Sequence, residues 1–174
     1  PYFNNPKMLA DNGITDGKAP AHFKKRLIPF SDEMAIDKKT IASTVARADV
    51  AVITLGRSAG ENYENGYLPF SSLEQELVRS VCEIYHNAGK KVVVVLNVGG
   101  VCETSSWSDH PDAILLAWQP GQEGGHAVAD ILKGKVNPSG KLPDTFPIKY
   151  EDLPSAASFP GVPADNPVNS FYEE

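Results

Sequence analysis

The sequence predicts an α/β fold, a three-layer α/β/α sandwich with a mostly parallel sheet and an irregular, proline-rich C-terminal segment. Short apolar runs alternate with amphipathic stretches at helical spacing, as expected of parallel strands that are covered on both faces. Hydrophobic residues make up 41% of the 174 residues and charged residues 22%, which is the mix of a folded globular domain. Beyond residue 137 the prolines become frequent and rule out long regular elements.

The first legible elements are a helix over Asp37–Ala48 and a strand over Asp49–Leu55. Asp37 is a suitable N-cap for the helix. The apolar residues that recur at helical spacing are Ile41, Ala42, Val45, Ala46 and Ala48. The strand is almost continuously apolar and ends at Gly56, and a polar loop to about Phe70 follows it.

The clearest helix begins after Ser71, which forms a capping-box signature with Glu74. Gly89 is expected to end this helix. Its predicted apolar face consists of Leu73, Leu77, Val81, Ile84, Tyr85 and Ala88.

Two further strands and a short helix complete the predicted pattern. Lys91–Asn97 and Asp112–Ala117 are apolar runs of strand length. A short helix follows Pro120–Gly121 and is capped by Gly134. Its apolar residues are Ala127, Val128, Ile131 and Leu132.

Ligands of parallel sheets bind at the loops that follow the carboxyl ends of the strands. In this sequence the loops are 56–70, 97–109 and 118–125. Trp107 and Trp118 lie in or beside two of them and serve either as core aromatics or as walls of a sugar site.

Glu61, in the first of these loops, is the candidate catalytic residue. It follows a small residue and Gly60, and both Arg57 and Tyr63 are near enough in sequence to orient it. If a partner surface desolvated this carboxyl, its pKa would rise and the group could donate a proton at neutral pH. The alternative is a solvated acidic loop with no catalytic role.

Several function classes are disfavoured by composition and motifs. The net charge of −6 argues against a general nucleic-acid binder, and no apolar run approaches the roughly 18 residues of a membrane span. Nucleotide-binding glycine motifs are absent. No metal site is expected, because the histidines are scattered without a ligand spacing. Cys82 and Cys102 are expected to be free thiols.

Five ordered segments resemble the C-terminal α/β-sandwich domain of the family 3 glycoside hydrolases, the β-glucosidase group. The resemblance runs from about residue 49 to residue 161. The segments are Gly56–Glu61, Lys91–Asn97, Ala113–Gly125, Val128–Gly134 and Asn137–Pro147.

The resemblance implies hydrolysis of terminal β-linked glucose from oligosaccharides or other β-glycosides, by a retaining mechanism and without a cofactor. In that family an N-terminal barrel domain carries the aspartate nucleophile, and the loop that matches here supplies the general acid/base. By position this residue is Glu61, with Glu64 as second choice, and Arg57 is a candidate substrate-binding residue. Ala59 replaces a small hydroxyl residue of many relatives, a departure that should not move the carboxylate.

The chain departs from the family pattern at both ends. Residues 1–150 are expected to form a partial α/β-sandwich domain whose first strand is missing, and residues 151–174 a linker toward a fibronectin-like domain. We therefore expect a fragment of a larger enzyme, inactive alone because the nucleophile lies outside it.

Two alternatives remain open for the parent protein. Instead of a β-glucosidase, it could be a β-xylosidase or another exo-glycosidase of the same family, or a non-catalytic binding or structural domain. The residues that select the sugar belong mostly to the barrel, so the sequence names neither sugar nor linkage. A periplasmic or secreted location is expected from relatives that act on plant oligosaccharides.

Overall fold

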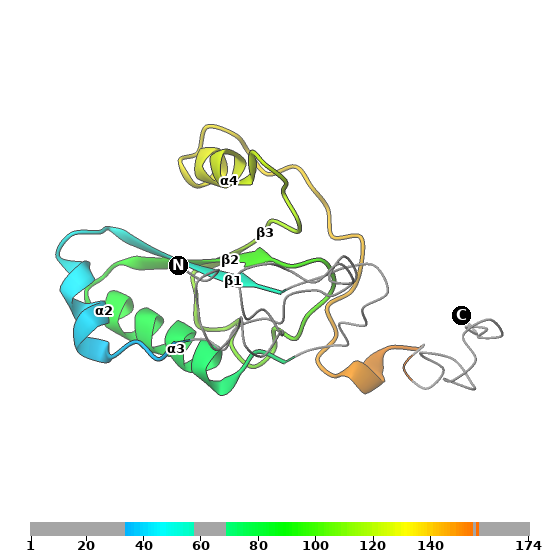
Figure 1. The fold of residues 1–174 in the computed structure, drawn as a ribbon, viewed down its shortest axis with the longest axis horizontal. Coiled ribbons are helices and arrows are strands. Elements are labelled where there is room, and N and C mark those ends of the chain that lie inside the picture. The colour runs from blue at the N-terminus through cyan, green and yellow to red at the C-terminus, as the bar shows by residue number, and fades with distance from the viewer. Residues whose placement is uncertain (1–33, 58–68, 155, 157–174) are drawn as a thin grey trace, which may run out of the picture.

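The computed structural model describes residues 34–57, 69–154 and 156. Figure 1 shows helices α2 and α3 on one side of a sheet and helix α4 on the other, so the predicted three-layer α/β/α arrangement is confirmed. In chain order the elements are α2 (Lys38–Val45), β1 (Val50–Gly56), α3 (Ser72–Asn87), β2 (Lys91–Asn97), β3 (Ala113–Leu116), α4 (Gly124–Leu132) and a 3₁₀ turn (Tyr150–Asp152).

The three described strands form a parallel sheet in the order β1-β2-β3. Val50 lies opposite Lys91 and Gly56 opposite Asn97, so β1 and β2 begin and end together. Strand β3 joins the other side of β2, with its last residue, Leu116, opposite Leu96. The loops after all three strands therefore leave the sheet at one edge, as the sequence predicted.

The helix starts form as the sequence predicted, whereas one helix end does not. The Asp37 carboxylate accepts a hydrogen bond of 2.8 Å from the amide of Thr40 at the start of α2. Helix α2 ends at Val45, three residues before its predicted end. The ammonium group of Lys90 donates to the carbonyls of Val45 and Ala48. A side chain from another part of the chain thus binds carbonyl groups that a longer helix would have paired with its own backbone amides.

The buried face of α3 is rotated from the predicted one. Val78 and Cys82 are fully buried, although the predicted face omits them, and Leu73 is 41% exposed, although it includes that residue. The sequence carries two overlapping stripes at helical spacing, and periodicity alone does not choose between them. Packing against the sheet and α2 selects the stripe Val78, Val81, Cys82 and Tyr85.

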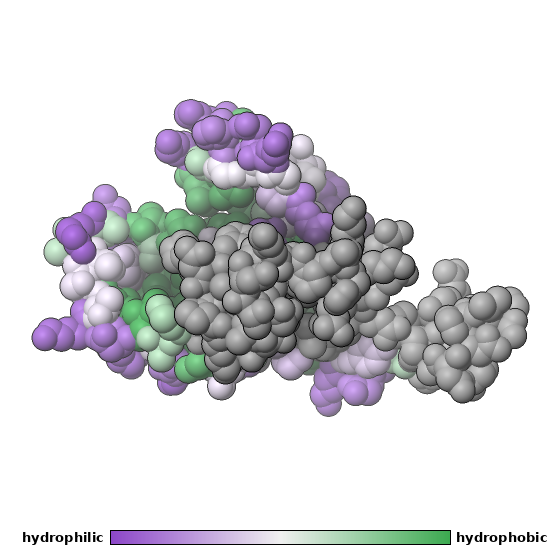
Figure 2. All heavy atoms as spheres, in the orientation of Figure 1, coloured by the Kyte–Doolittle hydropathy of each residue, from purple (hydrophilic) through white to green (hydrophobic). Residues whose placement is uncertain are grey.

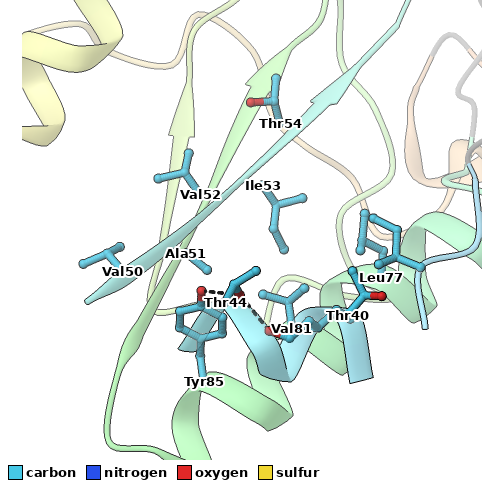
Figure 3. A pocket seen from close by; sticks show the side chains of 12 residues that line it. Thr40, Thr44, Val50, Ala51, Val52, Ile53, Thr54, Leu77, Val81 and Tyr85 are labelled. Atoms are coloured by element: carbon cyan, nitrogen blue, oxygen red, sulfur yellow. Dashed lines mark hydrogen bonds between the residues drawn. The ribbon is translucent and has the colours of Figure 1, made fainter. Parts of the chain in front are cut away.

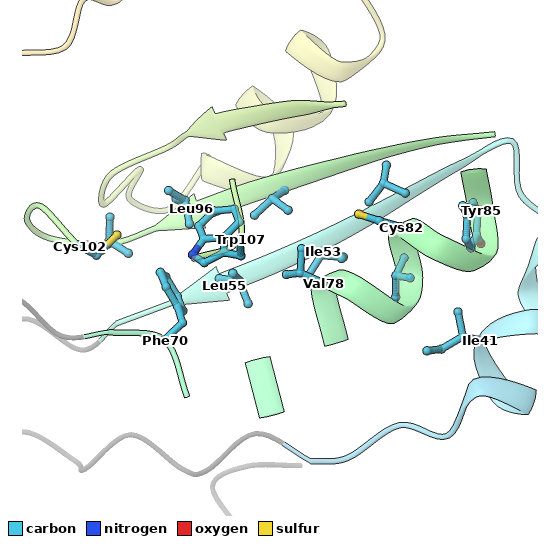
Figure 4. Packing of buried hydrophobic residues seen from close by; sticks show 14 residues of the cluster. Ile41, Ile53, Leu55, Phe70, Val78, Cys82, Tyr85, Leu96, Cys102 and Trp107 are labelled. Atoms are coloured by element: carbon cyan, nitrogen blue, oxygen red, sulfur yellow. The ribbon is translucent and has the colours of Figure 1, made fainter. Parts of the chain in front are cut away.

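The hydrophobic core lies between the sheet and the α2–α3 layer. Side chains of β1 and β2 alternate between the two faces of the sheet, and every second one enters this core. Figure 4 shows the packing of the cluster. Its buried members are Ile41, Ile53, Leu55, Phe70, Val78, Val81, Cys82, Tyr85, Val92, Val94, Leu96, Val98, Cys102 and Trp107.

The opposite layer, formed by α4, covers the sheet less completely. Val128 and Ile131 are half-buried, whereas Ala127 and Leu132, the other apolar residues predicted for this helix, are exposed. Figure 2 shows polar residues over the outer side of α4 and apolar residues beneath it. On β1, the side chains of Val50 and Val52 are 46% and 49% exposed. The described residues thus bury one face of the sheet well and the other only partly.

Asp112 ties the amino ends of β2 and β3 together. Its carboxylate accepts hydrogen bonds of 2.7 Å from the ammonium of Lys91 and 2.8 Å from the amide of Val92. The ring of His86 lies 2.8 Å from the same carboxylate. The Lys91 hydrogen bond, then those from Val92 and His86, hold the pKa of Asp112 far below its ordinary value.

The described part of the C-terminal stretch, residues 137–154, has no helix or strand apart from the 3₁₀ turn. The domain boundary expected at residue 150 stays a prediction. None of the described helices combines the length and apolar character needed to cross a bilayer.

Two adjacent glycines at the start of α4 make a matched test of this layer. A Cβ on Gly124 would lie 2.5 Å from Cγ and 2.8 Å from Cβ of the Pro120 ring, whereas a Cβ on Gly125 would meet nothing within 4 Å. We expect Gly124→Ala to lower the free energy of unfolding by about 1–3 kcal/mol. Gly125→Ala should leave it unchanged or raise it by up to about 0.5 kcal/mol. Urea denaturation measures both, and equal effects would contradict this packing.

Candidate active site

The carboxyl edge of the sheet is a continuous, hydrogen-bonded rim. Beyond the end of β1 the amide of Arg57 donates to the carbonyl of Asn97 over 3.1 Å, and beyond β3 the amide of Ala117 donates to Leu96 over 2.9 Å. The backbone is therefore fixed where the loops depart. Any functional group on these loops starts from a rigid base.

Arg57 forms a buried, two-pronged ion pair with Glu74. One terminal nitrogen, Nη1, lies 2.7 Å from Oε1 of Glu74, and the other, Nη2, lies 3.0 Å from Oε2. Nη1 also donates to the carbonyl of Gly56 over 2.7 Å. The two side chains are only 12% and 4% exposed. This fork-to-fork arrangement is the geometry in which arginine binds a carboxylate most specifically.

Glu74 joins that pair to the start of helix α3. Its Oε2 accepts a hydrogen bond of 2.7 Å from the amide of Ser71, and the Ser71 hydroxyl accepts one of 3.2 Å from the amide of Glu74. Burial raises the pKa of Glu74, but the hydrogen bonds from Arg57 and Ser71 outweigh it and the net pKa is lowered. Glu74 is therefore ionised at neutral pH.

Two aromatic rings support the ion pair from beneath. The Arg57 guanidinium lies 4.0 Å from the centroid of the Phe70 ring, a cation–π contact. Phe70 meets Trp107 edge to face, with centroids 5.4 Å apart and planes at 86°. Figure 4 shows both rings at the end of the sheet where β1 stops. Trp107 is 1% exposed. Of the two roles that the sequence left open for it, this residue is therefore a core aromatic and not a wall of a sugar site.

A second buried carboxylate, Glu103, lies in the loop after β2. Its oxygens accept hydrogen bonds of 2.7 Å from both the amide and the hydroxyl of Ser106, and the Ser105 hydroxyl donates to Oε1. Burial raises the pKa of Glu103, yet these hydrogen bonds outweigh it and the net pKa is lowered. The carboxylate closes the turn that carries Trp107, whose indole N–H donates to the Glu103 carbonyl over 3.3 Å.

The two cysteines are free and buried. Burial raises the pKa of both thiols to about 11. For Cys102 the cation of Arg57 acts in the opposite direction but does not cancel the effect of burial. Neither thiol is a nucleophile at neutral pH, because the thiolate is the reactive form.

Trp118 follows β3 in a left-handed backbone conformation, with φ of 51°. This conformation costs a residue other than glycine about 1–2 kcal/mol. Its ring lies 6.3 Å from that of Phe146, centroid to centroid, and is half-buried. The contact joins the β3 loop to the proline-rich segment. That Trp118 forms a wall of a sugar site remains a prediction.

The described acids of this edge leave the proton-donor role open. Hydrogen bonds from neighbouring groups lower the pKa of both Glu74 and Glu103 and so favour their ionised form. Glu123, at the start of α4, is exposed and lies 2.6 Å from a ring nitrogen of His126. A general acid at neutral pH needs a raised pKa, and neither buried acid has one.

The predicted catalytic residue lies outside the described residues. Glu61, the second choice Glu64 and the neighbouring Tyr63 all fall in the segment 58–68. Arg57, which was expected to orient Glu61, is described. Its guanidinium forms an ion pair with Glu74. Sequence reasoning did not find Glu74 or Phe70 as its partners, because the capping-box signature already accounted for Glu74.

A groove of about 510 Å³ runs along β1 beside α2 and α3, away from this edge. Figure 3 shows it lined by valine, isoleucine and threonine side chains, with the hydroxyls of Thr44 and Tyr85 2.8 Å apart inside it. Its described lining contains no carboxylate and no cationic side chain. The groove therefore lacks the groups for acid–base chemistry. Among the described residues, no cluster of histidine, cysteine and acidic side chains could hold a metal ion.

Comparison with known proteins agrees with this architecture. The family model described as "Glycosyl hydrolase family 3 C-terminal domain" matches residues 10–174. The solved structure of β-glucosidase 3B from Thermotoga neapolitana in complex with glycerol is 42% identical, with a TM-score of 0.79 over 97% of this chain and 23% of that one.

Curated relatives give the same result. β-Glucosidase B of Emericella nidulans is 38% identical over 133 residues, which are 74% of this chain and 15% of the relative. An exo-α-(1→6)-L-arabinopyranosidase of Bifidobacterium breve is 33% identical over 88% of this chain and 20% of the relative. The fold is thus that of a glycoside hydrolase domain. The chain belongs to glycosyl hydrolase family 3, as its C-terminal domain, and spans less than a quarter of the length of these relatives.

The segment Gly56–Gly60 also has the Gly-x-Ser-x-Gly spacing of the nucleophile elbow in serine hydrolases. In that elbow the serine stands on a sharp turn between a strand and the helix that follows. Ser58 lies outside the described residues, and the next described helix after β1 begins at Ser72. Because family membership accounts for the segment, the spacing alone does not indicate a serine hydrolase.

Replacing Glu74 tests the ion pair as a structural element. Glu74→Gln leaves a buried guanidinium without its counter-charge, and we expect the free energy of unfolding at pH 7 to fall by about 3–5 kcal/mol. Glu76→Gln, on the exposed side of the same helix, is the matched control and should change it by less than about 0.5 kcal/mol.

The pH dependence gives the sign of the same effect. Because folding lowers the pKa of Glu74, its contribution is fully present above the unfolded value of about 4.5 and is lost as the pH falls toward the folded pKa. Glu74→Gln should therefore lose less stability than the wild type between pH 6 and pH 3. Parallel curves for the two proteins would show that Glu74 does not contribute in this way.

Proposed function

We propose that this domain supplies the general acid/base of a retaining exo-glycosidase that releases terminal β-linked glucose, and that Glu61 is that residue. The nucleophile would come from an N-terminal barrel domain of the same enzyme. The proposal combines the family membership with one structural observation. At the carboxyl edge of the sheet, hydrogen bonds lower the pKa of both buried carboxylates, which supports another acid on these loops as the proton donor.

Glu61 is the acid best placed along the chain for this task. It follows Arg57 by four positions, and Arg57 is fixed at the rim of the sheet by its backbone bond to Asn97. Retaining hydrolysis requires two carboxyl groups about 5–5.5 Å apart. Glu61 would face the barrel aspartate across the domain boundary at that separation.

The reaction then follows two steps. The aspartate attacks the anomeric carbon while the Glu61 carboxyl protonates the departing glycosidic oxygen, which gives a covalent glycosyl-enzyme. Glu61, now ionised, removes a proton from water as the water attacks the same carbon from the opposite side to the aspartate, which breaks the glycosyl–aspartate bond and releases the sugar and the free aspartate carboxylate. Consumption of the nucleophile's charge lowers the pKa of Glu61, which suits it to act as base.

The choice of sugar is the least constrained part of the proposal. One curated relative is a β-glucosidase and another an exo-α-(1→6)-L-arabinopyranosidase, although this chain resembles both at more than 30% identity. Glucose is proposed because β-glucosidases recur among both the curated relatives and the solved structures. A β-xylosidase or another exo-glycosidase of the family is the second candidate. We retain Arg57 as a candidate substrate contact.

Glu61→Ala in the full-length enzyme tests the acid/base role. The value of kcat/KM should fall by about 10²–10⁴-fold for alkyl glucosides, whose leaving groups need protonation, and far less for 2,4-dinitrophenyl glucoside. Added azide should restore turnover of the activated substrate and give the β-glucosyl azide. Steady-state kinetics and NMR of the product measure these outcomes.

Glu64→Ala is the matched control, three positions along the same segment. We expect it to retain the leaving-group dependence of the wild type and to give no azide product. If Glu64→Ala shows the rescue and Glu61→Ala does not, the assignment within the loop is wrong. If neither variant does, the acid/base is neither Glu61 nor Glu64.

The 174-residue chain alone should not hydrolyse aryl β-glucosides, because retaining hydrolysis needs a second carboxyl group as nucleophile. A sensitive fluorogenic assay with the purified chain checks this expectation. Turnover that disappears in Glu61→Gln would contradict it and would place the nucleophile within these residues.

A further inference from the structure

We propose that the outer edge of β1 and the apolar groove beside it bind a further strand, parallel to β1, which the polypeptide N-terminal to these 174 residues supplies. In the described sheet, β1 has β2 on one side and no strand on the other. Its pairing with β2 is one-to-one from Val50 to Gly56. Among the described residues, the other edge of β1 is therefore regular along its whole length and open to a partner.

The hydrogen bond from the amide of Arg57 to Asn97 shows which backbone groups of β1 face this edge. Successive residues of a strand direct their backbone groups to alternate sides, so every second residue before Arg57 also faces β2. Val52 and Thr54, between those residues, direct their amide and carbonyl groups outward. Gly56 fits the same alternation, because its carbonyl accepts from the Arg57 side chain.

Strand β1 has none of the features that protect a permanent edge strand from pairing. Charged side chains, prolines and bulges usually block such an edge. The strand reads Val-Ala-Val-Ile-Thr-Leu-Gly, without charge or proline, and its regular register contains no bulge. Such a sequence is typical of a strand with neighbours on both sides, in the interior of a parallel sheet.

The surfaces on both sides of the open edge are apolar. On the side of α2 and α3, the groove of about 510 Å³ is lined by Ile36, Ile41 and Leu77, together with side chains of β1. On the other side, Val50 and Val52 are half-exposed, and Figure 3 shows them pointing away from the helices. A strand that fits this place is therefore apolar on both of its faces.

The positions of α2 and α3 indicate where in the chain the strand belongs. Both helices lie on one side of the sheet (Figure 1), and α3 is the crossover from β1 to β2. Crossovers between parallel strands are right-handed in almost all proteins. A parallel strand that is joined to β1 through α2 therefore lies on the side of β1 away from β2, which is the open edge.

The polypeptide before residue 1 is the source that we infer for this strand. The sequence of residues 1–33 has no uninterrupted apolar run of strand length and is divided by Pro6, Pro20 and Pro29. The relatives are much longer, since this chain matches 23% of β-glucosidase 3B and 15% of β-glucosidase B, as a C-terminal domain. The first strand that the sandwich domain is expected to have thus gains a defined place.

Hydrogen exchange of single amides in the full-length protein tests the pairing. Relative to their unstructured rates, the amides of Val52 and Thr54 should exchange at least about 100-fold more slowly than that of the exposed Gly140, because the added strand binds them. The amide of Ile53, which faces β2, should be slow in either case and is the control. Fast exchange at Val52 and Thr54, with Ile53 slow, would overturn the inference.

Photo-cross-linking in the full-length protein identifies the occupant. The variant Val52→p-benzoylphenylalanine places a reactive group on a half-exposed side chain at the edge. Mass spectrometry should find it joined to a peptide that precedes residue 1. The matched control is Val136→p-benzoylphenylalanine, at an exposed valine after α4, which should not capture that peptide. Capture of β1 from a second copy would make the edge a dimer interface, and capture of any other segment would equally overturn the inference.

Discussion

The carboxylate of Glu74 connects elements that the rest of the site depends on. It caps helix α3 through Ser71 and binds Arg57 at the end of β1 with both oxygens. The Phe70 and Trp107 rings close the space around the pair. One buried anion is therefore bound both to the start of the helix and to the end of the strand, and the Phe70 ring beside the pair packs against Trp107 of the β2 loop. In the protein interior such an anion must be fully hydrogen-bonded, and here it is.

Much of the fold could be predicted because its signals are local. The apolar runs, the caps at Asp37 and Ser71 and the stop at Gly89 each act within a few residues, and all appear where expected. The buried face of α3 could not be predicted, since two apolar stripes overlap and only contact with the sheet selects one. The end of α2 could not be predicted for a similar reason, because the Lys90 side chain that binds the carbonyls there comes from a distant part of the chain.

The shared edge of the three loops was predictable, whereas the contacts of the side chains at that edge were not. The parallel order of the strands is enough to bring the three loops to one edge. The partners of Arg57 are different, because an ion pair between residues 57 and 74 depends on how strand and helix pack. Glu74 already had a complete local explanation as a capping residue, so nothing in the sequence pointed to its second role. Glu103 was likewise hidden, since its hydrogen bonds come from a turn without a repeating pattern.

The hydrogen-bond network around Asp112 lies at the end of the sheet opposite the candidate site. At the amino end, Asp112 binds Lys91, Val92 and His86, while the loops of the proposed chemistry leave from the opposite edge. The adjoining turn at Asn87–Gly89 is exposed and contributes no side chain to that network. It is thus a suitable place to attach a fluorophore or a surface tether, because a probe there would lie at the end of the sheet opposite the candidate site.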